Sequence, residues 1–376
     1  MSFYPICAEL ESFPLDERLA AVTVDDVRRA LSSTICSRDD FIALMSPAAS
    51  SMLEEMAQKA SQLTLQNFGR TIHLFTPLYL SNFCTNHCVY CGFNAKNKIP
   101  RSQLEVDQLD VEAKAIAATG LKHLLILTGE APAKASPEYL ESCMEVLRKY
   151  FPSVSIEIYA MTEDEYARMV KAGVDGLTLY QETYDEALYE TLHPRGPKKD
   201  FRFRLDAPER GCRAGMRVVN IGALLGLGDW RRDALITAMH ADYLMEKYSE
   251  VDIAVSLPRM RPHVGEFQPQ SIVSDHDMVQ FMLALRIYRP RLGITVSTRE
   301  APEFRDNILP LGVTKMSAGV STEVGGHTQN GEKVGQFDIS DGRSVDEMCA
   351  MLKGHGYQPV FKDWEPIADS YSEDRA

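Results

Sequence analysis

Residues 71 to 80 have the sequence TIHLFTPLYL, an apolar run of strand length that is rich in β-branched and aromatic side chains. From this run onward, similar runs alternate with segments of helical periodicity, a pattern typical of βα units and a parallel sheet. Eight such runs predict a closed (β/α)8 TIM-type barrel of the α/β class, although a doubly wound open sheet shows the same alternation. The eight are TIHLFTPLYL (71–80), HLLILTG (123–129), SVSIEIYA (153–160), GLTLYQET (176–183), MRVVNIGALLGL (216–227), VDIAVSL (251–257), GITVSTR (293–299) and VTKMSAG (313–319).

The regions on either side of the predicted barrel have a different character. Residues 1–70 contain several helical segments, among them TVDDVRRAL and SSMLEEMAQKASQLTLQNFG, so we expect a helical N-terminal extension. Beyond about residue 325 the chain becomes polar and rich in Gly before one further helix, SVDEMCAMLKGHG. We therefore predict a barrel over residues 71–325 and a C-terminal capping segment, residues 326–376, that packs on it.

Composition excludes several classes of protein. The net charge of -13 opposes non-specific binding to nucleic acid, and no apolar run approaches the roughly 20 residues that cross a bilayer. The N-terminus lacks the pattern of an export signal, and eight scattered or clustered cysteines are too few for a disulfide framework, so we expect a cytoplasmic protein. One basic stretch, HPRGPKKDFRFR at 193–204, is either a solvated loop or a site beside an anionic ligand.

Three of the eight cysteines, Cys84, Cys88 and Cys91, lie together directly after the first predicted strand. A barrel builds its active site from loops at this end of its strands, so the placement indicates function. Structural zinc requires a fourth ligand, and His87, between two of the cysteines, is a cramped candidate. An electron-transfer 4Fe-4S cluster normally takes four cysteines, whereas a cluster held by three leaves one iron open to a substrate or cofactor.

The stretch CTNHCVYC (84–91), with an aromatic residue before its third cysteine, resembles the signature of the radical S-adenosylmethionine (SAM) enzymes. LTGE (127–130) resembles the second-strand motif of that superfamily, usually Gly-Gly-Glu, with Thr128 in place of the first glycine. NIGALLGLGD (220–229) resembles the glycine-containing fifth-strand motif that lies along the adenine. The resemblance implies a 4Fe-4S cluster on the three cysteines, SAM on its open iron, and contacts to SAM from Gly129 and Glu130; the alternative for Glu130 is a surface acid.

Longer segments resemble the aromatic amino acid lyase group within this superfamily, among them ALLGLGDWRRD, SLPRMRP, VSTREAPEFRD and PVFKDW. The resemblance runs from about residue 71 to the C-terminus. One member of the group carries a second cluster on a C-terminal cysteine motif, which this chain lacks, so the thiazole-forming tyrosine lyase is the better match. The implied reaction cleaves the Cα–Cβ bond of L-tyrosine to 2-iminoacetate and p-cresol, with 5'-deoxyadenosine and methionine formed from SAM.

The same resemblance implies two protein partners. Because the product imine hydrolyses readily, a complex with a thiazole synthase subunit is expected, and the cluster requires a reductant such as flavodoxin or ferredoxin. Three alternatives remain: a lyase of the same group that acts on tryptophan, one that acts on tyrosine in another pathway, and a non-catalytic Fe-S or zinc protein that uses a barrel as a scaffold.

Four further residues are candidate contacts to SAM. Arg213 resembles an arginine that meets the SAM carboxylate in relatives; its alternative is a helix-surface residue. Glu157, on the third predicted strand, is a candidate partner of the ribose or else faces water. Gln181 and Glu182 end the fourth strand, and because successive side chains alternate, only one of them can face the barrel interior.

Three residues are candidates for contact with the substrate. Arg299, at the end of ITVSTR, offers two parallel donors to the substrate carboxylate, a geometry that lysine cannot reproduce; the alternative is a structural salt bridge. Tyr90, inside the cysteine loop, is placed to touch SAM or the substrate amine. Ser317, at the end of the eighth strand, is placed to hydrogen-bond the substrate.

Overall fold

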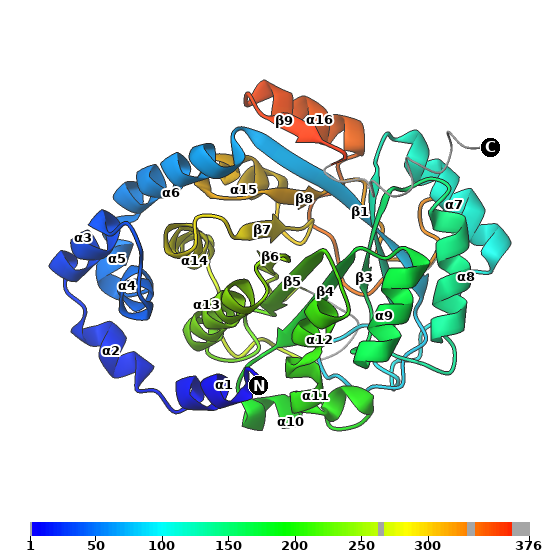
Figure 1. Ribbon diagram of the computed structural model, residues 1–376, viewed down its shortest axis with the longest axis horizontal. Coiled ribbons are helices and arrows are strands. Elements are labelled where there is room, and N and C mark those ends of the chain that lie inside the picture. Colours follow the sequence, from blue (N-terminus) through cyan, green and yellow to red (C-terminus); the bar gives the residue numbers. More distant parts are fainter. Residues whose placement is uncertain (1, 262–266, 329–334, 363–376) are drawn as a thin grey trace.

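The protein is described by a computed structural model that covers residues 2–261, 267–328 and 335–362. Its eight main strands are all parallel and pair in the order β2-β3-β4-β5-β6-β7-β8-β1, and β1 also pairs with β2, which closes the barrel (Figure 1). The closed barrel is confirmed and the open-sheet alternative is wrong. The strands are β1 (Thr71–Ser81), β2 (His123–Thr128), β3 (Ser153–Glu157), β4 (Gly176–Glu182), β5 (Val218–Ala223), β6 (Asp252–Ser256), β7 (Gly293–Val296) and β8 (Lys315–Ser317).

Helices surround the barrel and follow the expected signals. Thr162 caps α9 together with Glu165, and Gly173 ends it with a φ of 104° in the left-handed region that favours glycine. The outer elements are α7 (Val106–Ala118), α8 (Pro137–Leu147), α9 (Glu163–Ala172), α10 (Glu186–Leu192), η1 (Pro197–Lys199), α11 (Phe201–Leu205), α12 (Ala207–Arg213), α13 (Trp230–Lys247), α14 (Asp275–Tyr288), α15 (Pro302–Asn307) and η2 (Leu309–Leu311).

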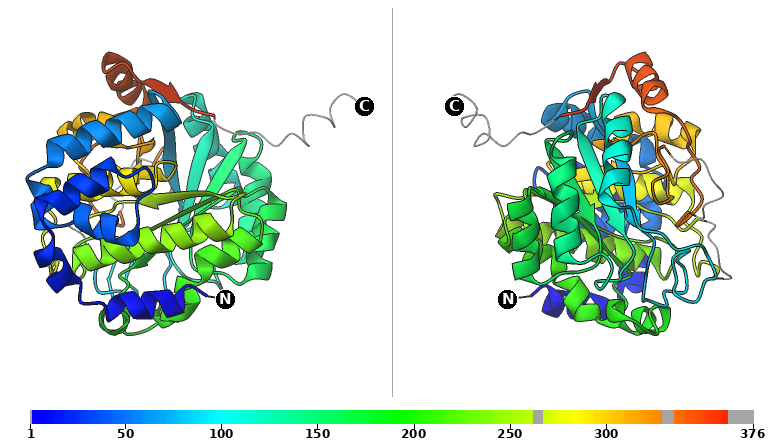
Figure 2. Two further views of the ribbon diagram at one scale, coloured as in Figure 1. Left: turned by 60° about the vertical axis from the view of Figure 1, so that its left-hand side comes forward. Right: turned by 90° about the vertical axis from the view of Figure 1, so that its right-hand side faces the viewer.

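The N-terminal residues form a curved row of helices along one side of the barrel (Figures 1 and 2). Their apolar faces pack on α13 and α14, and the ring of Phe3 stacks on His240 of α13 with 4.2 Å between centroids. The row therefore covers apolar surface that α13 and α14 alone would expose. Its members are α1 (Tyr4–Glu11), α2 (Leu15–Ala21), α3 (Val24–Ser32), α4 (Arg38–Leu44), α5 (Pro47–Ser50) and α6 (Leu53–Phe68).

Near the C-terminus, α16 (Val345–Gly354) is followed by a short strand, β9 (Gln358–Val360), that pairs with β1. This ninth strand was not predicted, because QPV is too short to show a period. Of the expected capping segment, residues 329–334 and 363–376 lie outside the described residues, so the three-part division of the chain stays a prediction. In the described part, no helix combines the length and the apolar character needed to cross a membrane.

Candidate active site

The loop with Cys84, Cys88 and Cys91 follows β1 at the carboxyl end of the barrel strands. It packs against the end of β2, where the Gly129 amide donates to the Ser81 carbonyl at 2.9 Å. The Phe83 carbonyl lies where a Cβ on residue 129 would be, so a larger residue there would displace the loop. The glycine of the predicted second-strand motif thus brings the cysteine loop and the end of β2 into contact.

Glu130, the acid of the same motif, is also fixed to the cysteine loop. Its carboxylate accepts from Nδ2 of Asn86 at 2.6 Å, and its carbonyl accepts from the amide of Thr85 at 2.9 Å. The structure therefore brings Glu130 beside the cysteines rather than leaving it on an open surface. Its contact with SAM stays a prediction.

The three thiols are close enough to influence one another. Burial raises the pKa of Cys88 and of Cys91, the neighbouring cysteine thiols act in the same direction, and the ammonium of Lys198 opposes the shift. In the described residues, no three Cys, His, Asp or Glu side chains converge closely enough to hold a single metal ion. A four-iron cluster spreads its thiolate ligands over separate irons, whereas a zinc ion gathers its ligands around one centre.

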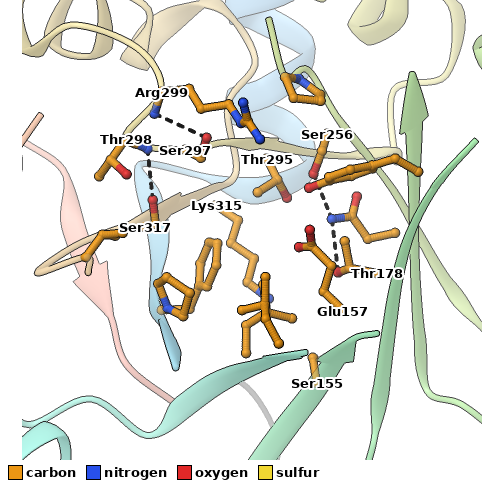
Figure 3. A pocket seen from close by; sticks show the side chains of 18 of the residues that line it. Ser155, Glu157, Thr178, Ser256, Thr295, Ser297, Thr298, Arg299, Lys315 and Ser317 are labelled. Carbon is orange, nitrogen blue, oxygen red and sulfur yellow. Dashed lines mark hydrogen bonds between the residues drawn. The ribbon is translucent and has the colours of Figure 1, made fainter. Parts of the chain in front are cut away.

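Beneath the loop lies an inner cavity bounded by residues of all eight strands. Its wall combines apolar side chains such as Leu125 and Leu177 with polar ones, and Figure 3 shows Arg299, Glu157 and Lys315 pointing into the same space. A concave, mostly apolar space with a few placed polar groups is typical of a small-molecule site.

An upper cavity joins this space to the cysteine loop. Its wall includes Tyr90 and Cys91 of the loop, and it shares Glu157, Tyr180 and Arg299 with the inner cavity. A group bound at the cysteines would therefore lie next to a molecule in the barrel. The structure brings together the cysteines, Tyr90, Glu157 and Arg299, as the sequence predicts, and adds Tyr180.

Arg299 is half-buried in the loop after β7. Its guanidinium lies 3.5 Å from the ring centroid of Phe337, and it takes part in no ion pair within the described residues. The structural salt bridge offered as the alternative is therefore not seen there. Nearby, burial raises the pKa of Glu157 to about 7, although the positive charge of Arg299 opposes this shift. Ser317 also lines the inner cavity, and its hydroxyl accepts from the Thr298 amide at 3.1 Å.

At the end of β4, the two candidates Gln181 and Glu182 point to different sides. Glu182 lines the upper cavity with Tyr180, whereas Gln181 is turned outward, with its Nε2 3.5 Å from the Phe201 carbonyl. An irregularity in the pairing of β4 with β5 lies between Tyr180 and Glu182, and Glu182 has a φ of 76°. Of the two, only Glu182 is positioned for a ligand in the upper cavity, so the prediction for Gln181 loses its geometric basis.

Sequence reasoning missed the partners of Glu182. Its carboxylate contacts Nζ of Lys198 at 2.6 Å and Nη2 of Arg204 at 3.4 Å. Burial acts to raise the pKa of Glu182, but these two cations outweigh it and hold the pKa below its ordinary value. Both cations belong to the basic stretch 193–204, so the positive charge of this stretch was the sequence feature that could have indicated them. The interpretation of the stretch as a solvated loop is wrong for these two residues, whose side chains are largely buried against Glu182.

Tyr90 is buried against a histidine that was also missed. Its hydroxyl lies 2.7 Å from Nε2 of His193, and Nδ1 of His193 lies 2.8 Å from the Tyr189 carbonyl. Because a carbonyl only accepts, Nδ1 carries the proton and Tyr90 donates to Nε2. Burial lowers the pKa of His193 to about 3, so the ring stays neutral. This hydrogen bond fixes the Tyr90 ring at the wall of the upper cavity.

Arg213 is not brought to this group of residues. It lies at the end of α12 in the outer layer of helices, where it pairs with Glu163 at 2.7 Å and with Glu209 at 3.1 Å. The two carboxylates satisfy its charge away from the cavities. Its position matches the helix-surface alternative and gives no support to a contact with the SAM carboxylate.

Comparisons with known proteins agree with this geometry. A model of the radical SAM superfamily matches residues 78–238, and a model of the Biotin and Thiamin Synthesis associated domain matches residues 256–358. The chain is 42% identical over 349 residues to a 2-iminoacetate synthase of Escherichia coli, with 93% of each chain covered. It is 39% identical over 368 residues to a 2-iminoacetate synthase of Salmonella typhimurium, with 98% of each covered.

Solved structures extend the similarity to the fold. The FeFe-hydrogenase maturase HydG from Carboxydothermus hydrogenoformans superposes with a TM-score of 0.84 at 32% identity, covering 96% of this chain and 83% of that one. Methylornithine synthase superposes with a TM-score of 0.73 at 21% identity, covering 92% and 99%, and this likeness shows the fold alone.

Proposed function

This chain belongs to the radical SAM superfamily and, within it, to the family of the 2-iminoacetate synthases, and we propose that it cleaves the Cα–Cβ bond of L-tyrosine. The products are 2-iminoacetate and p-cresol, with 5'-deoxyadenosine and methionine formed from SAM. The observation that carries the proposal is one continuous site, in which the cysteine loop, through Cys91, opens onto a cavity that also holds the guanidinium of Arg299. This guanidinium forms no ion pair among the described residues.

The residues present fit a 4Fe-4S cluster and SAM. Cys84, Cys88 and Cys91 would hold three irons, and Glu130 and Glu182 lie beside them as carboxylates for the polar groups of SAM. When bound, the cluster and SAM supply a one-electron cleavage that generates a 5'-deoxyadenosyl radical, chemistry that no side chain of the protein provides.

The remaining groups act on the substrate. Arg299 presents two parallel N–H donors to the tyrosine carboxylate, and the apolar wall around Leu125 and Leu177 accepts the aromatic ring. The carboxyl of Glu157, with its pKa raised to about 7, can accept a proton from the substrate ammonium at neutral pH. The substrate is thereby held with its amino group directed toward the upper cavity and the cysteine loop.

The test is product analysis on anaerobically reconstituted protein. With SAM, reductant and tyrosine, we expect 5'-deoxyadenosine and p-cresol in equal amounts. An indole product from tryptophan with no p-cresol from tyrosine would reassign the substrate within the same lyase group. A protein that takes up no iron and cleaves no SAM would refute the enzyme assignment altogether.

We further propose a small acidic one-electron carrier, such as flavodoxin or ferredoxin, as the reductant. Support comes from four exposed cations around the cysteine loop, in a protein whose net charge is -13, that form no ion pair among the described residues: Lys96, Lys98, Lys134 and Arg195. The rate of cluster reduction by flavodoxin should fall steeply with added salt, while reduction by a neutral photoreductant should not.

The product suggests a second partner and a location. An imine hydrolyses in water, so we propose a thiazole synthase subunit that receives 2-iminoacetate directly; co-purification of the two proteins from an expressing cell tests this. All eight thiols are free in the structure, which supports a reducing compartment, and we propose the cytoplasm.

A further inference from the structure

The loop that carries the cysteines starts and ends at a narrow neck. The Leu104 amide donates to the Leu80 carbonyl at 2.8 Å, and the Asn82 amide donates to the Ser102 carbonyl at 3.1 Å. The Asn82 side chain closes the same neck, because its Oδ1 accepts from the Ser102 amide at 2.7 Å and its Nδ2 donates to the Pro100 carbonyl at 2.9 Å. The intervening residues therefore leave the barrel and return to it at one point.

A single half-buried guanidinium, that of Arg101, stands at this neck and reaches into the loop. Nη1 donates to the carbonyls of Asn82 at 2.7 Å and Phe93 at 2.9 Å. Nη2 donates to the carbonyls of Asn94 at 2.7 Å and Asn97 at 3.3 Å. These four bonds use all the hydrogens of the two terminal nitrogens and join the start of the loop to the segment after its third cysteine.

Two of the residues held by Arg101 hold the cysteines in turn. Nδ2 of Asn94 donates to the Cys88 carbonyl at 2.9 Å. Nδ2 of Asn97 donates to the Cys91 carbonyl at 3.3 Å and to that of Gly92 at 3.0 Å. The Arg101 guanidinium is thus linked to the backbones of Cys88 and Cys91 through one intervening residue each. All of these contacts are between groups of the protein itself.

We propose that Arg101 is a positioning residue that preassembles the cysteine loop, so that its three thiols are held for cluster insertion before any iron is present. This inference rests on the proposed cluster site. The physical reason is entropy, since fixing each residue in one conformation costs free energy, and a loop ordered in advance does not incur this cost when the cluster binds. The planar fork is essential, because the single nitrogen of lysine has three hydrogens and cannot span four carbonyls.

The decisive experiment uses the metal-free protein and compares Arg101→Lys, Arg101→Gln and wild type by amide hydrogen exchange. The Ala95 amide, which donates to the Asn86 carbonyl at 2.9 Å inside the loop, is the reporter. Both variants should exchange at this amide at least tenfold faster than wild type. Arg168→Lys is the matched control, since Arg168 also forms a forked contact, with Glu141 and Glu138, but does so on the outer helices.

After reconstitution, both Arg101 variants should release iron to a chelator at least tenfold faster than wild type and the Arg168→Lys control. If Arg101→Lys behaves as wild type in both measurements while Arg101→Gln does not, charge alone is sufficient and the proposal is wrong. Unchanged exchange and iron release in both variants would also refute it.

A second variant covers the case in which neither Arg101 variant folds. Asn97→Ala removes the ties to the Cys91 and Gly92 carbonyls and leaves the Arg101 guanidinium in place. We expect a smaller acceleration of iron release in the same direction; no change would refute the chain of contacts. These results are separable from the proposed function. A wild-type protein that binds no cluster would refute that function, whereas the exchange measurement on metal-free protein concerns the loop itself.

Discussion

The role of Arg299 can be tested by two substitutions of different severity. If its guanidinium binds the tyrosine carboxylate through two N–H donors, each bond to a charged group contributes about 1.5 to 3 kcal/mol. Arg299→Lys keeps the charge but loses one bond, so kcat/KM for tyrosine should fall about 10- to 100-fold, since 1.4 kcal/mol is tenfold. Arg299→Ala loses both bonds and the charge, and a fall on the order of 1,000-fold is expected.

A substrate analogue makes the test specific. Tyramine has the phenol and the amine of tyrosine but no carboxylate, so wild type should bind tyrosine much more tightly than tyramine, and Arg299→Ala should bind the two about equally. Binding is measured by calorimetry on reconstituted protein and p-cresol formation by chromatography. Arg291→Ala, at the opposite end of β7, serves as the control and should leave the preference for tyrosine unchanged.

Two outcomes would refute this reasoning. Arg299→Ala could retain the preference of wild type for tyrosine over tyramine, in which case another group binds the carboxylate. It could instead lose the brown colour of the cluster, which would show that Arg299 supports the structure of the cysteine loop.

Three further predictions concern other parts of the molecule. Cys88→Ser should abolish both the absorbance near 400 nm and SAM cleavage, whereas Cys349→Ser, on α16, should retain both. Tyr90→Phe loses the hydrogen bond to His193 but not the packing, so the cluster should persist while kcat for p-cresol falls about tenfold; equal kcat would remove Tyr90 from the site. Burial raises the pKa of Asp233 to about 7, whereas the pKa of this carboxyl in the unfolded chain stays near 3.8. Between these two pH values the folded state holds a proton that the unfolded state has released. The free energy of unfolding should therefore fall as pH rises from 3.8 to 7, by at most roughly 4 kcal/mol. Asp233→Asn should flatten this slope, which urea unfolding of metal-free protein near pH 5 and near pH 7.5 measures.

The fold was predictable because its signal is repeated. The barrel strands are buried along most of their length, and β2 and β5 show this as nearly continuous burial on both faces. Strand ends were less predictable: the fifth run was expected to reach residue 227, but β5 ends at Ala223, where the chain turns into a loop that still buries Leu224 and Leu227. Apolar character marks burial, and burial continues after the ladder of hydrogen bonds has stopped.

The cysteines were predictable because three thiols at close spacing, directly after a strand, serve few purposes besides binding a metal centre. Arg299 was a candidate because it follows a strand, and the loops after the strands of a barrel gather at the end where ligands bind. The hydrogen bond between Tyr90 and His193 could not be foreseen, because it joins residues 103 positions apart and depends on how the basic stretch folds back over the cysteine loop.

The contrast between Arg204 and Arg213 shows where sequence reasoning reaches its limit. Both follow the same strand, and charge does not distinguish them. Arg204 lies on α11, next to the end of β4, and donates to the Tyr180 carbonyl at 2.8 Å, while Arg213 lies one helix later and meets carboxylates of the outer layer. Which arginine lies beside the strand end depends on the break between α11 and α12 at Asp206, a local feature that no periodicity in the sequence announces. Removing each guanidinium in turn tests this difference. Arg204→Gln should weaken SAM binding, because Glu182 then has only Lys198 as a cationic partner. Arg213→Gln should leave SAM binding unchanged and lower only the thermal stability. An equal loss of SAM affinity in both variants would mean that the outer layer, and not the strand end, controls the site.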